Sequence, residues 1–492
     1  MTSANRVQLA WCRETIPGTT NTTPRMRKIR WTGEGLKLFS PEYIDGNEIT
    51  DDRMTNDPTR IYQGSGGSFN FNLSYPPNLS PESDIIASAM YNEWTLTPER
   101  DNDGTADTVI TDLGTTVNVA TVTTGPAFVV GQLVRFSGNT APANNLVAKC
   151  TTGSATVPAF AGATFTADPA PAATSRMKVV GFQGAVGDIT ATAAGLGSTV
   201  LDFTTLGLQI GQTLKIGNSL VAGEKFTTPA LNVYVTVAAV TPILITLGNK
   251  PAGWAVDTGA GKTISVYYGD FIKNGILVST TRVCGTLEEG YLGQATPTYR
   301  VGKGMTVDTL TFDFKHKGRI ECVANFVGQG GSESTTALDA IPDARSTGNN
   351  FASNVNFAKL MEGGVLTGTP NFPRALNIEI KNNLRGIEDV TQDFSPGINE
   401  GENETNTKFE TYYGSDGTLT KFYNGTPTSF HAVEQVNNQA VSWFLPRQTY
   451  RGGGDPNASG KNTDVMLNLE GKASRDVTTA AHCIINRLEF VS

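Results

Sequence analysis

The stretch Gly67-Ser68-Phe69-Asn70-Phe71-Asn72-Leu73-Ser74-Tyr75 decides the fold class of this chain. Its aromatic and aliphatic residues alternate with serine and asparagine, the period of two by which a β-strand turns one face to a core. The same alternation returns at Leu310 to Phe314, Ile320 to Phe326, Leu376 to Ile380 and Val465 to Leu469. The 53 glycines and 24 prolines among 492 residues are typical of turn-dense β structure. The sequence therefore predicts an all-β fold.

One or two short helices interrupt this pattern. Ser80 can cap a helix that has Pro81 at its first position, and an apolar stripe then runs to Met90. A second, weaker helix pattern runs from Asn354 to Met361 and stops at two glycines. We expect these helices to be minor additions to a β framework.

A polar excursion, Pro41 to Arg60, precedes the deciding stretch. It holds six carboxylates and two arginines and has no apolar periodicity. Such a charge load keeps a segment out of the interior, so the pattern predicts a long projecting loop or hairpin tip. The segment is either a contact surface or simply a solvated loop.

The length of the chain indicates two to four domains. Residues 104–270 hold only eight acidic and eight basic side chains, whereas the whole chain has 46 and 38. Within them, the segment 128–138 is echoed by 208–218, each with a Gly-Gln turn leading into an alternating strand. We predict two tandem small β modules, 104–186 and 187–270, inserted into one discontinuous β domain made of 1–103 and 271–492.

The residue types that carry catalysis are not grouped. The three histidines, His316, His431 and His482, lie far apart in the sequence, and the adjacent carboxylates Glu288-Glu289 and Asp51-Asp52 cannot converge on one substrate bond from a single strand. We predict no catalytic, cofactor or metal site. The five cysteines have no paired short spacing and are expected to be reduced core residues: Cys12, Cys150, Cys284, Cys322 and Cys483.

The sequence shows neither a secretory signal nor an apolar run long enough to span a membrane. We therefore expect a protein that is made and kept in a cytoplasm-like compartment.

Several of these segments, in this order, resemble the major tail tube protein family of long-tailed, siphovirus-like bacteriophages. The segments that carry the resemblance are Arg30 to Glu34, Glu48 to Arg53, Gly67 to Tyr75, Phe271 to Gly275, Gly285 to Gly290, Asn382 to Arg385, Tyr412 to Gly414 and Leu445 to Arg447. No single motif is specific, but the order and spacing are.

The resemblance implies a β-sandwich or barrel-like structural subunit rather than an enzyme. Six copies would close into a ring, and rings would stack into a hollow tail tube through which double-stranded DNA passes at ejection. The implied partners are further copies of the chain and the tail terminator, tape measure and distal tail proteins, with no membrane anchoring. The protein would be assembled in the host bacterial cytoplasm and reside in the virion tail. The inserted modules would decorate the exterior, because they would obstruct a channel just wide enough for DNA.

Charge suggests how rings could stack. Duplex DNA carries one negative charge per roughly 1.7 Å, so a net charge of −8 suits a conduit that does not hold DNA. Head-to-tail contacts need two different, complementary surfaces. The N-terminal 30 residues are basic, whereas 41–60 and 388–410 are acidic. The candidate stacking residues are Glu48, Asp51, Asp52, Arg53, Asp57, Arg60, Arg27 and Arg30.

Two alternatives remain open. A phage receptor-binding or adhesin protein would use the modules to bind carbohydrate, with Trp254 and Tyr267-Tyr268 as the available aromatic platform. A capsid decoration protein would share the β richness without the tube-like order of segments.

Overall fold

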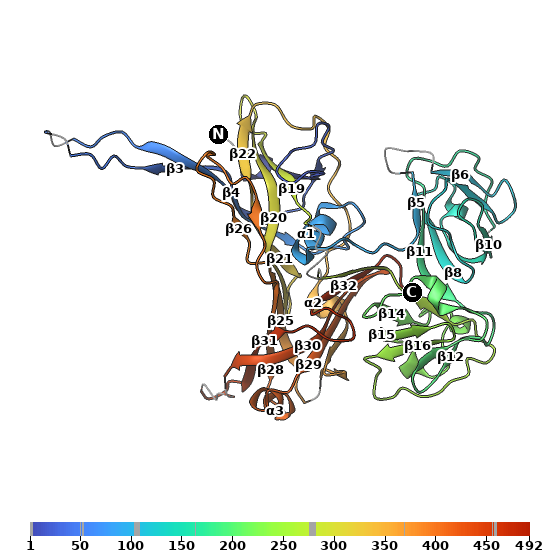
Figure 1. Cartoon of the computed structure of the whole chain (residues 1–492). Helices are drawn as coiled ribbons and strands as arrows, with labels where there is room; N and C mark the ends of the chain where they lie inside the picture. The colour runs from blue at the N-terminus through green and yellow to red at the C-terminus, as the bar shows by residue number, and fades with distance from the viewer. Residues whose placement is uncertain are drawn as a thin grey trace.

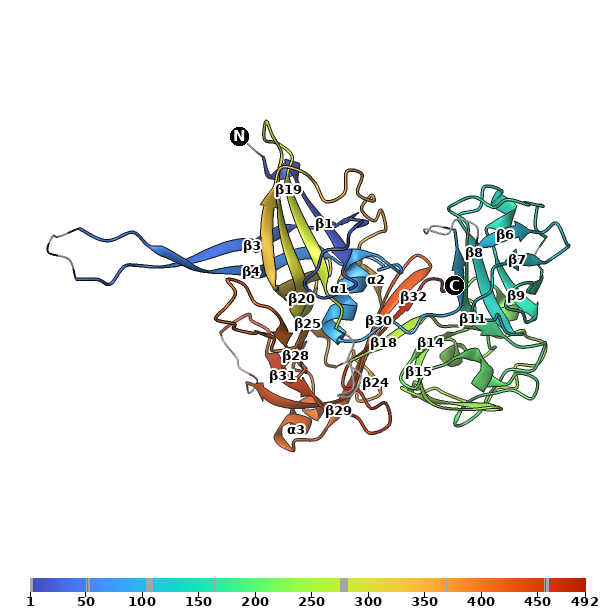
Figure 2. The same ribbon diagram turned by 45° about the horizontal axis from the view of Figure 1, so that its top comes forward.

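The computed structural model describes residues 3–49, 51, 54–102, 109–162, 164–274, 282–368, 370–454, 456 and 460–492. The chain is elongated and built almost entirely from antiparallel strands, which confirms the all-β prediction (Figure 1). A central domain, formed by residues 3–98 and 270–492, carries a long hairpin on one side. A separate β body, residues 99–268, lies on the opposite side, as a second view also shows (Figure 2).

The predicted strand lies at the centre of the N-terminal part of the central domain. Phe69 and Phe71 are fully buried on β4, which pairs with β3 on one side and β21 on the other. The strand ends at Asn72, although Leu73 and Tyr75 remain buried beyond it. The elements of this part are β1 (Val7–Arg13), β2 (Arg27–Lys28), β3 (Gly33–Ile44), β4 (Thr59–Asn72), α1 (Pro81–Met90), β18 (Asp270–Lys273), β19 (Gly285–Tyr291), β20 (Thr298–Lys315), β21 (Glu321–Val327) and β22 (Gly330–Ser334).

The excursion predicted as a loop or hairpin tip is a projecting hairpin. Only its two ends are strand, because β3 continues to Ile44 and β4 begins at Thr59. The tip proper is therefore residues 45–58.

The first predicted helix is confirmed and the second is largely wrong. Ser80 caps α1 by accepting a hydrogen bond from the Ser83 amide at 3.2 Å, with Pro81 in the first turn. Only Ser353–Asn356 (α2) is helical in the second region, and the rest is strand β23. Pairing of β23 with β29 overrides the weak helical pattern, and no side chain caps α2.

The C-terminal part of the central domain continues the same antiparallel arrangement. Its elements are β23 (Phe357–Glu362), β24 (Val365–Leu366), β25 (Pro373–Lys381), β26 (Arg385–Gly386), β27 (Ile398–Asn399), β28 (Glu404–Tyr412), α3 (Gly417–Tyr423), β29 (Thr428–Val436), β30 (Gln439–Gly453), β31 (Met466–Ala473) and β32 (Ile484–Leu488). One hydrophobic core spans both parts, and Phe312 and Phe314 stack edge-on against Trp443, with ring centroids 5.4 and 5.0 Å apart.

The lateral body has a sheet and a core of its own. Its strands are β5 (Glu99–Asp101), β6 (Ile110–Leu113), β7 (Ala120–Val122), β8 (Gln132–Ser137), β9 (Val147–Thr152), β10 (Ala159–Ala161), β11 (Arg176–Gln183), β12 (Thr190–Ala191), β13 (Gly195–Gly197), β14 (Thr213–Ile216), β15 (Tyr234–Thr241), β16 (Leu244–Gly248) and β17 (Ser265–Tyr267). Pairing of β11 with β17 makes this sheet continuous across both predicted modules. The boundary between the two modules, predicted at residues 186 and 187, stays a prediction.

The repeated Gly-Gln segments fold alike. Gly131 and Gly211 have φ of 92° and 89°, values that suit glycine. In each copy the following glutamine oxygen accepts a hydrogen bond from the amide three residues earlier, at 2.8 Å for Gln132 and 2.9 Å for Gln212. The sequence echo is thus a repeated turn that starts β8 and β14.

Candidate assembly surfaces

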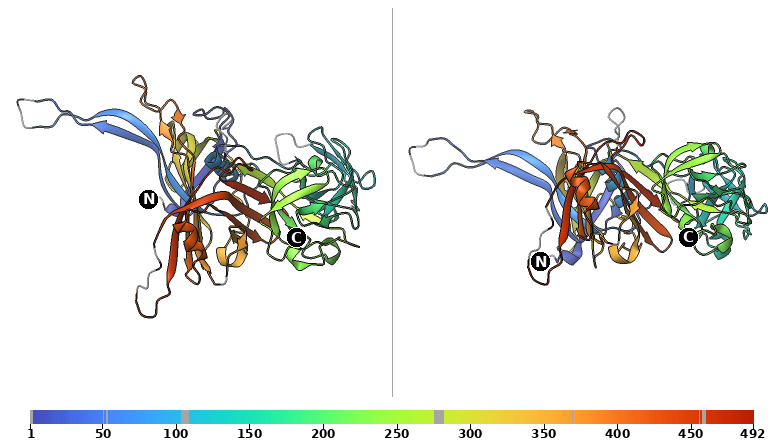
Figure 3. Two further views of the ribbon diagram at one scale, coloured as in Figure 1. Left: turned by 60° about the horizontal axis from the view of Figure 1, so that its bottom comes forward. Right: turned by 90° about the horizontal axis from the view of Figure 1, so that it is seen from below.

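The β3–β4 hairpin exposes large apolar side chains away from the core. Ile49 and Met54 at the tip are 102% and 76% exposed. Tyr43, Ile44 and Ile61 on the adjoining strands are more than half exposed. Apolar side chains gathered on a projecting element indicate a surface that another protein covers. The views agree that the hairpin extends away from the lateral body (Figures 1 and 3).

The predicted stacking residues divide into two groups. The acidic tip residues Glu48, Asp51 and Asp57 are exposed, and Glu48 accepts a hydrogen bond from Asn56 at 3.1 Å. Asp52 and Arg53 lie outside the described residues.

The other three predicted residues, all arginines, bond within the chain. Arg60 pairs with Asp393 at 3.0 Å, and Arg27 pairs with Asp343 at 3.4 Å. Arg30 donates to the Gly348 carbonyl at 2.6 Å and to the Asn350 side chain at 2.7 Å. The structure therefore collects three acidic groups on the tip and places the arginines at the root of the hairpin and in the domain behind it.

A segment of the C-terminal part braces the root of the hairpin. The Gln63 amide donates to the Asp393 carbonyl at 2.7 Å, beside the Arg60–Asp393 ion pair. The Gln329 side chain donates to the Pro396 carbonyl at 2.8 Å, from the strand region next to β22. These bonds hold the segment 393–396 against the root of the hairpin and the neighbouring strand region.

A buried ionic network attaches the lateral body to the central domain. Asp270 is fully buried and accepts hydrogen bonds from Lys178 on β11 and Arg487 on β32, both at 2.8 Å. Burial alone would raise the pKa of Asp270, but the two cations outweigh it and hold the pKa well below its ordinary value. Lys178 also pairs with Glu99 at 3.1 Å, and Arg176 pairs with Glu489 at 2.9 Å. The body is thus tied to the last strand of the central domain.

A second contact joins β14 and β15 to β29, β30 and β32. Buried His431 lies 3.2 Å from the Thr213 hydroxyl, which accepts from Ser442 at 2.8 Å. Tyr234 donates to Gln435 at 2.7 Å. A small apolar cluster fills the same interface: Leu133, Val180, Tyr234, Tyr267, Val433, Ala440, Leu488 and Val491. The lateral body is therefore a packed part of the molecule and not a tethered appendage.

Glu434, next to this interface on β29, predicts a pH effect on stability. It is fully buried, neither carboxylate oxygen has a partner within the described residues, and burial raises its pKa to about 9. The folded state thus binds one more proton than the unfolded state between about pH 4.5 and 9. The free energy of unfolding therefore falls as the pH rises through this range. We expect Glu434→Gln to remove this loss.

Urea denaturation between pH 5 and 7 would measure it. The free energy of unfolding of wild type, relative to Glu434→Gln, should fall by about 1.4 kcal/mol per pH unit. The buried neighbours Lys359, with a pKa lowered by burial to about 7, and His431, with a pKa lowered well below its ordinary value, are the same in both proteins. If the free energies of unfolding of wild type and Glu434→Gln change with pH in parallel, Glu434 is not the group responsible.

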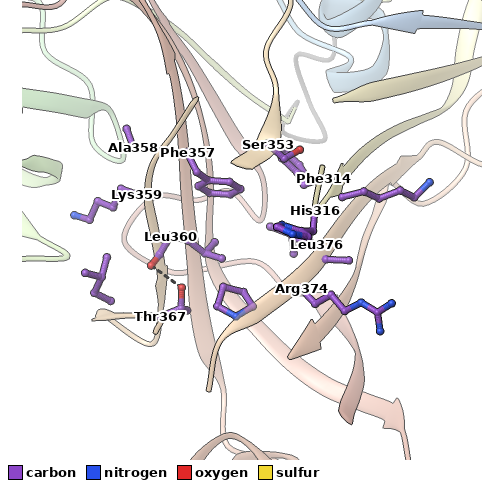
Figure 4. A pocket seen from close by; sticks show the side chains of 14 residues that line it. Phe314, His316, Ser353, Phe357, Ala358, Lys359, Leu360, Thr367, Arg374 and Leu376 are labelled. Atoms are coloured by element: carbon purple, nitrogen blue, oxygen red, sulfur yellow. Dashed lines mark hydrogen bonds between the residues drawn. The ribbon is translucent and has the colours of Figure 1, made fainter. Parts of the chain in front are cut away.

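The central domain also contains a cavity of about 330 Å³ between β20, β23, β24 and β25 (Figure 4). Phe314, Phe357 and Leu376 form an apolar floor, and Arg374 extends beside it. His316 at its edge is exposed, and among the described residues no carboxylate or thiol lines the cavity. The lining combines this apolar floor with the polar groups of Ser353, Thr367 and Lys359.

All five cysteines, which lie among the described residues, are buried and free of disulfides. Among the described residues, no group of three or more histidine, cysteine, aspartate or glutamate side chains could hold a metal ion. In that part of the chain no helix is long and apolar enough to cross a membrane.

The structure is thus an all-β subunit with an exposed projecting hairpin and a packed lateral body, a form that suits a structural building block of a larger assembly. Comparison with protein families makes this specific. The family model described as phage tail tube protein matches residues 4–250 and 235–473. The chain belongs to this phage tail tube family, and its role is that of a structural component of the virion tail. No curated protein matches the chain.

Sequence reasoning identified the projecting hairpin but missed the attachment of the lateral body. Lys178, Asp270 and Arg487 are separated by 92 and 217 residues along the chain. Nothing in their local sequence signals that they meet. The low charge density of residues 104–270 was the available hint, because its few charges include Lys178 and Asp270.

Proposed function

We propose that copies of this chain close into rings that stack into a hollow conduit for the phage genome. The resemblance to tail tube proteins gives six positions around each ring. The observation that carries the proposal is the projecting hairpin, because it exposes large apolar side chains, among them Ile44, Ile49 and Ile61, that a partner surface can cover, and its acidic tip can orient that partner. DNA would pass transiently through the lumen, and the terminator, tape measure and distal tail proteins would meet the ends of the tube. Assembly would take place in the host cytoplasm.

The lateral body would lie on the outside of the tube. It extends from the side of the central domain opposite the hairpin, so a neighbour can receive the hairpin without meeting it (Figure 3). The boundaries proposed for its two modules are 104–186 and 187–270, with 1–103 and 271–492 forming the wall. The modules would be decoration.

Electron microscopy of the purified chain tests both statements. A biotin-acceptor peptide inserted after Thr116, in an exposed turn beside Val117, would mark the lateral body. We expect hollow tubes that bind streptavidin along their outer surface. Globular shells or discrete particles would contradict the tube function, and intact tubes that leave the label inaccessible would contradict the outer position.

The acidic tip predicts a charge effect on stacking. We propose that the 41–60 hairpin reaches an adjoining ring and that its charged residues set the register there. The double variant Asp51→Lys/Asp52→Lys should fold normally but form few or no tubes, because its tip would repel the cationic groups that it now attracts. Sedimentation of polymer at low salt would measure this. Asp51→Asn/Asp52→Asn is the matched control and should be less impaired; normal tubes from the lysine variant would count against ring contact by this loop.

A further inference from the structure

The central domain contains the same strand arrangement twice. The first set, in chain order, is β1, β2, β3, β4, α1, β19, β20, β21 and β22; the second is β23, β24, β25, β28, α3, β29, β30, β31 and β32. Each antiparallel pairing of the first set has a counterpart in the second. The corresponding pairings, first set and then second set, are β1–β2 and β23–β24, β1–β19 and β23–β29, β19–β20 and β29–β30, β20–β21 and β30–β31, β21–β4 and β31–β28, β3–β4 and β25–β28, and β20–β22 and β30–β32.

Two register shifts occur at equivalent positions in the two sets. The β20–β21 register shifts just after Val307, and the β30–β31 register shifts just after Tyr450. A second shift lies near the first in each set. In the first set, Met305, two residues before Val307, pairs with Gly285, and the β19–β20 register shifts there. In the second set, Gln448, two residues before Tyr450, pairs with Thr428, and the β29–β30 register shifts there. A bulge is a specific local feature of a strand, and two in the same register are not required by a generic β sheet. The central domain is therefore two copies of one tube unit.

The two units are joined through their sheet edges. The second half of β20, in the first unit, pairs with β25 of the second unit from Thr309 opposite Lys381 to Lys315 opposite Ala375. Along this joint Phe312 and Ile378 are directly opposite and fully buried. The joint thus combines a hydrogen-bonded ladder with a shared core.

Where the structure describes them, the two edges that correspond to this joint are unpaired within the chain. The counterpart of β25 is β3, which pairs only with β4 in the described residues. The counterpart of the β20 segment that forms the joint begins at Gly452 of β30, and its described strand residues, Gly452 and Gly453, pair only with β31. Unpaired strand edges are templates for pairing with another chain. We propose that β3 of one copy pairs with the second half of β30 in the next copy, in the register of the internal joint.

This inference rests on the proposed function and gives its stoichiometry. Contact between two different edges is head-to-tail and closes into a ring when the rotation allows. Because each chain supplies two tube units, three chains fill the six positions of a ring, in place of the six copies that the resemblance implies. The lateral body occurs once per chain and packs on β29, β30 and β32 of the second unit, so the tube exterior has three-fold symmetry.

The shared register names residues that meet between copies. The shifts align Val307 with Tyr450, so Thr311, four residues later, corresponds to Gly454. The ladders that connect these strands to β3 and β25 align Lys37 with Glu379. Thr311 and Glu379 are directly opposite in the internal joint. Lys37 and Gly454 should therefore face each other across the joint between chains.

Disulfide crosslinking tests this contact. The variant Lys37→Cys/Gly454→Cys places thiols at an exposed residue and at a glycine whose added Cβ meets no atom within 4 Å. Tubes are oxidised, dissolved in detergent without reductant and separated by electrophoresis. We expect a ladder that ends at three chains. The control Lys37→Cys/Lys408→Cys has its second thiol on β28, between β25 and β31, and should give only monomer.

Each outcome has a distinct meaning. A ladder that ends at six chains would overturn the stoichiometry, and tubes without crosslinks would overturn the joint. If the purified chain forms no tubes, the proposed function fails as well. Cryo-electron microscopy of wild-type tubes provides a measurement that needs no variant: three-fold symmetry, with alternating decorated and undecorated positions, supports the inference, whereas six identical decorated positions overturn it.

Discussion

Tubes are expected to disappear when the hairpin tip, residues 45–58, is replaced by a two-residue Asn-Gly turn. Asn-Gly closes a hairpin in a type I′ turn, so β3 and β4 can still pair. The variant loses Ile49 and Met54, whose burial in a partner would contribute about 1.5–3 kcal/mol for each side chain. The loss recurs at every copy, so the purified variant should stay soluble and unassembled in electron micrographs while its circular dichroism remains that of the wild type.

Milder variants separate this effect from a general loss of hairpin structure. Ile49→Ser/Met54→Ser keeps the full tip but should also lower the yield of sedimentable tube. A loss of about 3 kcal/mol of binding free energy lowers the association constant between subunits by about a hundredfold or more. Val117→Ser/Ile243→Ser removes two comparably exposed apolar side chains from the lateral body and should leave assembly unchanged. Normal assembly of the tip variants would show that the exposed hairpin is not an interface.

The second large effect concerns the network that attaches the lateral body. Asp270→Asn should lower the free energy of unfolding by about 3–5 kcal/mol, because it leaves the buried cations Lys178 and Arg487 without their shared carboxylate. Both ion pairs measure 2.8 Å, and the Asp270 and Arg487 side chains are fully buried. Urea denaturation followed by tryptophan fluorescence measures the change.

The surface provides a control for the same chemical change. Glu470 pairs with Lys408 at 3.3 Å, but both side chains are more than half exposed. Glu470→Gln should therefore change the unfolding free energy by about 1 kcal/mol or less. If Asp270→Asn is no more destabilising than Glu470→Gln, the network does not hold the lateral body in place.

Part of the assembly surface was predictable because its signals are local. The charge of the 41–60 stretch and its lack of apolar periodicity indicate a projecting element whatever it packs against. The pairing of its arginines was not predictable. Arg60 meets Asp393 across 333 residues, and neither neighbourhood in the sequence points to the other.

The two equivalent strand sets of the central domain were likewise only partly predictable from the sequence. Strands β4 and β28 both precede a short helix and then a hairpin, an order that is visible in the sequence once it is looked for. The two copies share few residues, however, and the lateral body separates α1 from β19. Only the ladder registers and their matching bulges establish that the two sets are equivalent.

The sequence by itself determined the strand class, the capped helix at Pro81, the repeated Gly-Gln turns and the charged projection, because alternation, capping and turn chemistry act between near neighbours. The tertiary structure alone decided that residues 353–362 form a strand for most of their length, that Asp270 joins two cations, and that two equivalent sheet edges are unpaired in the part of the chain that the structure describes. Each of these depends on pairing between segments distant in the chain, which local sequence does not encode.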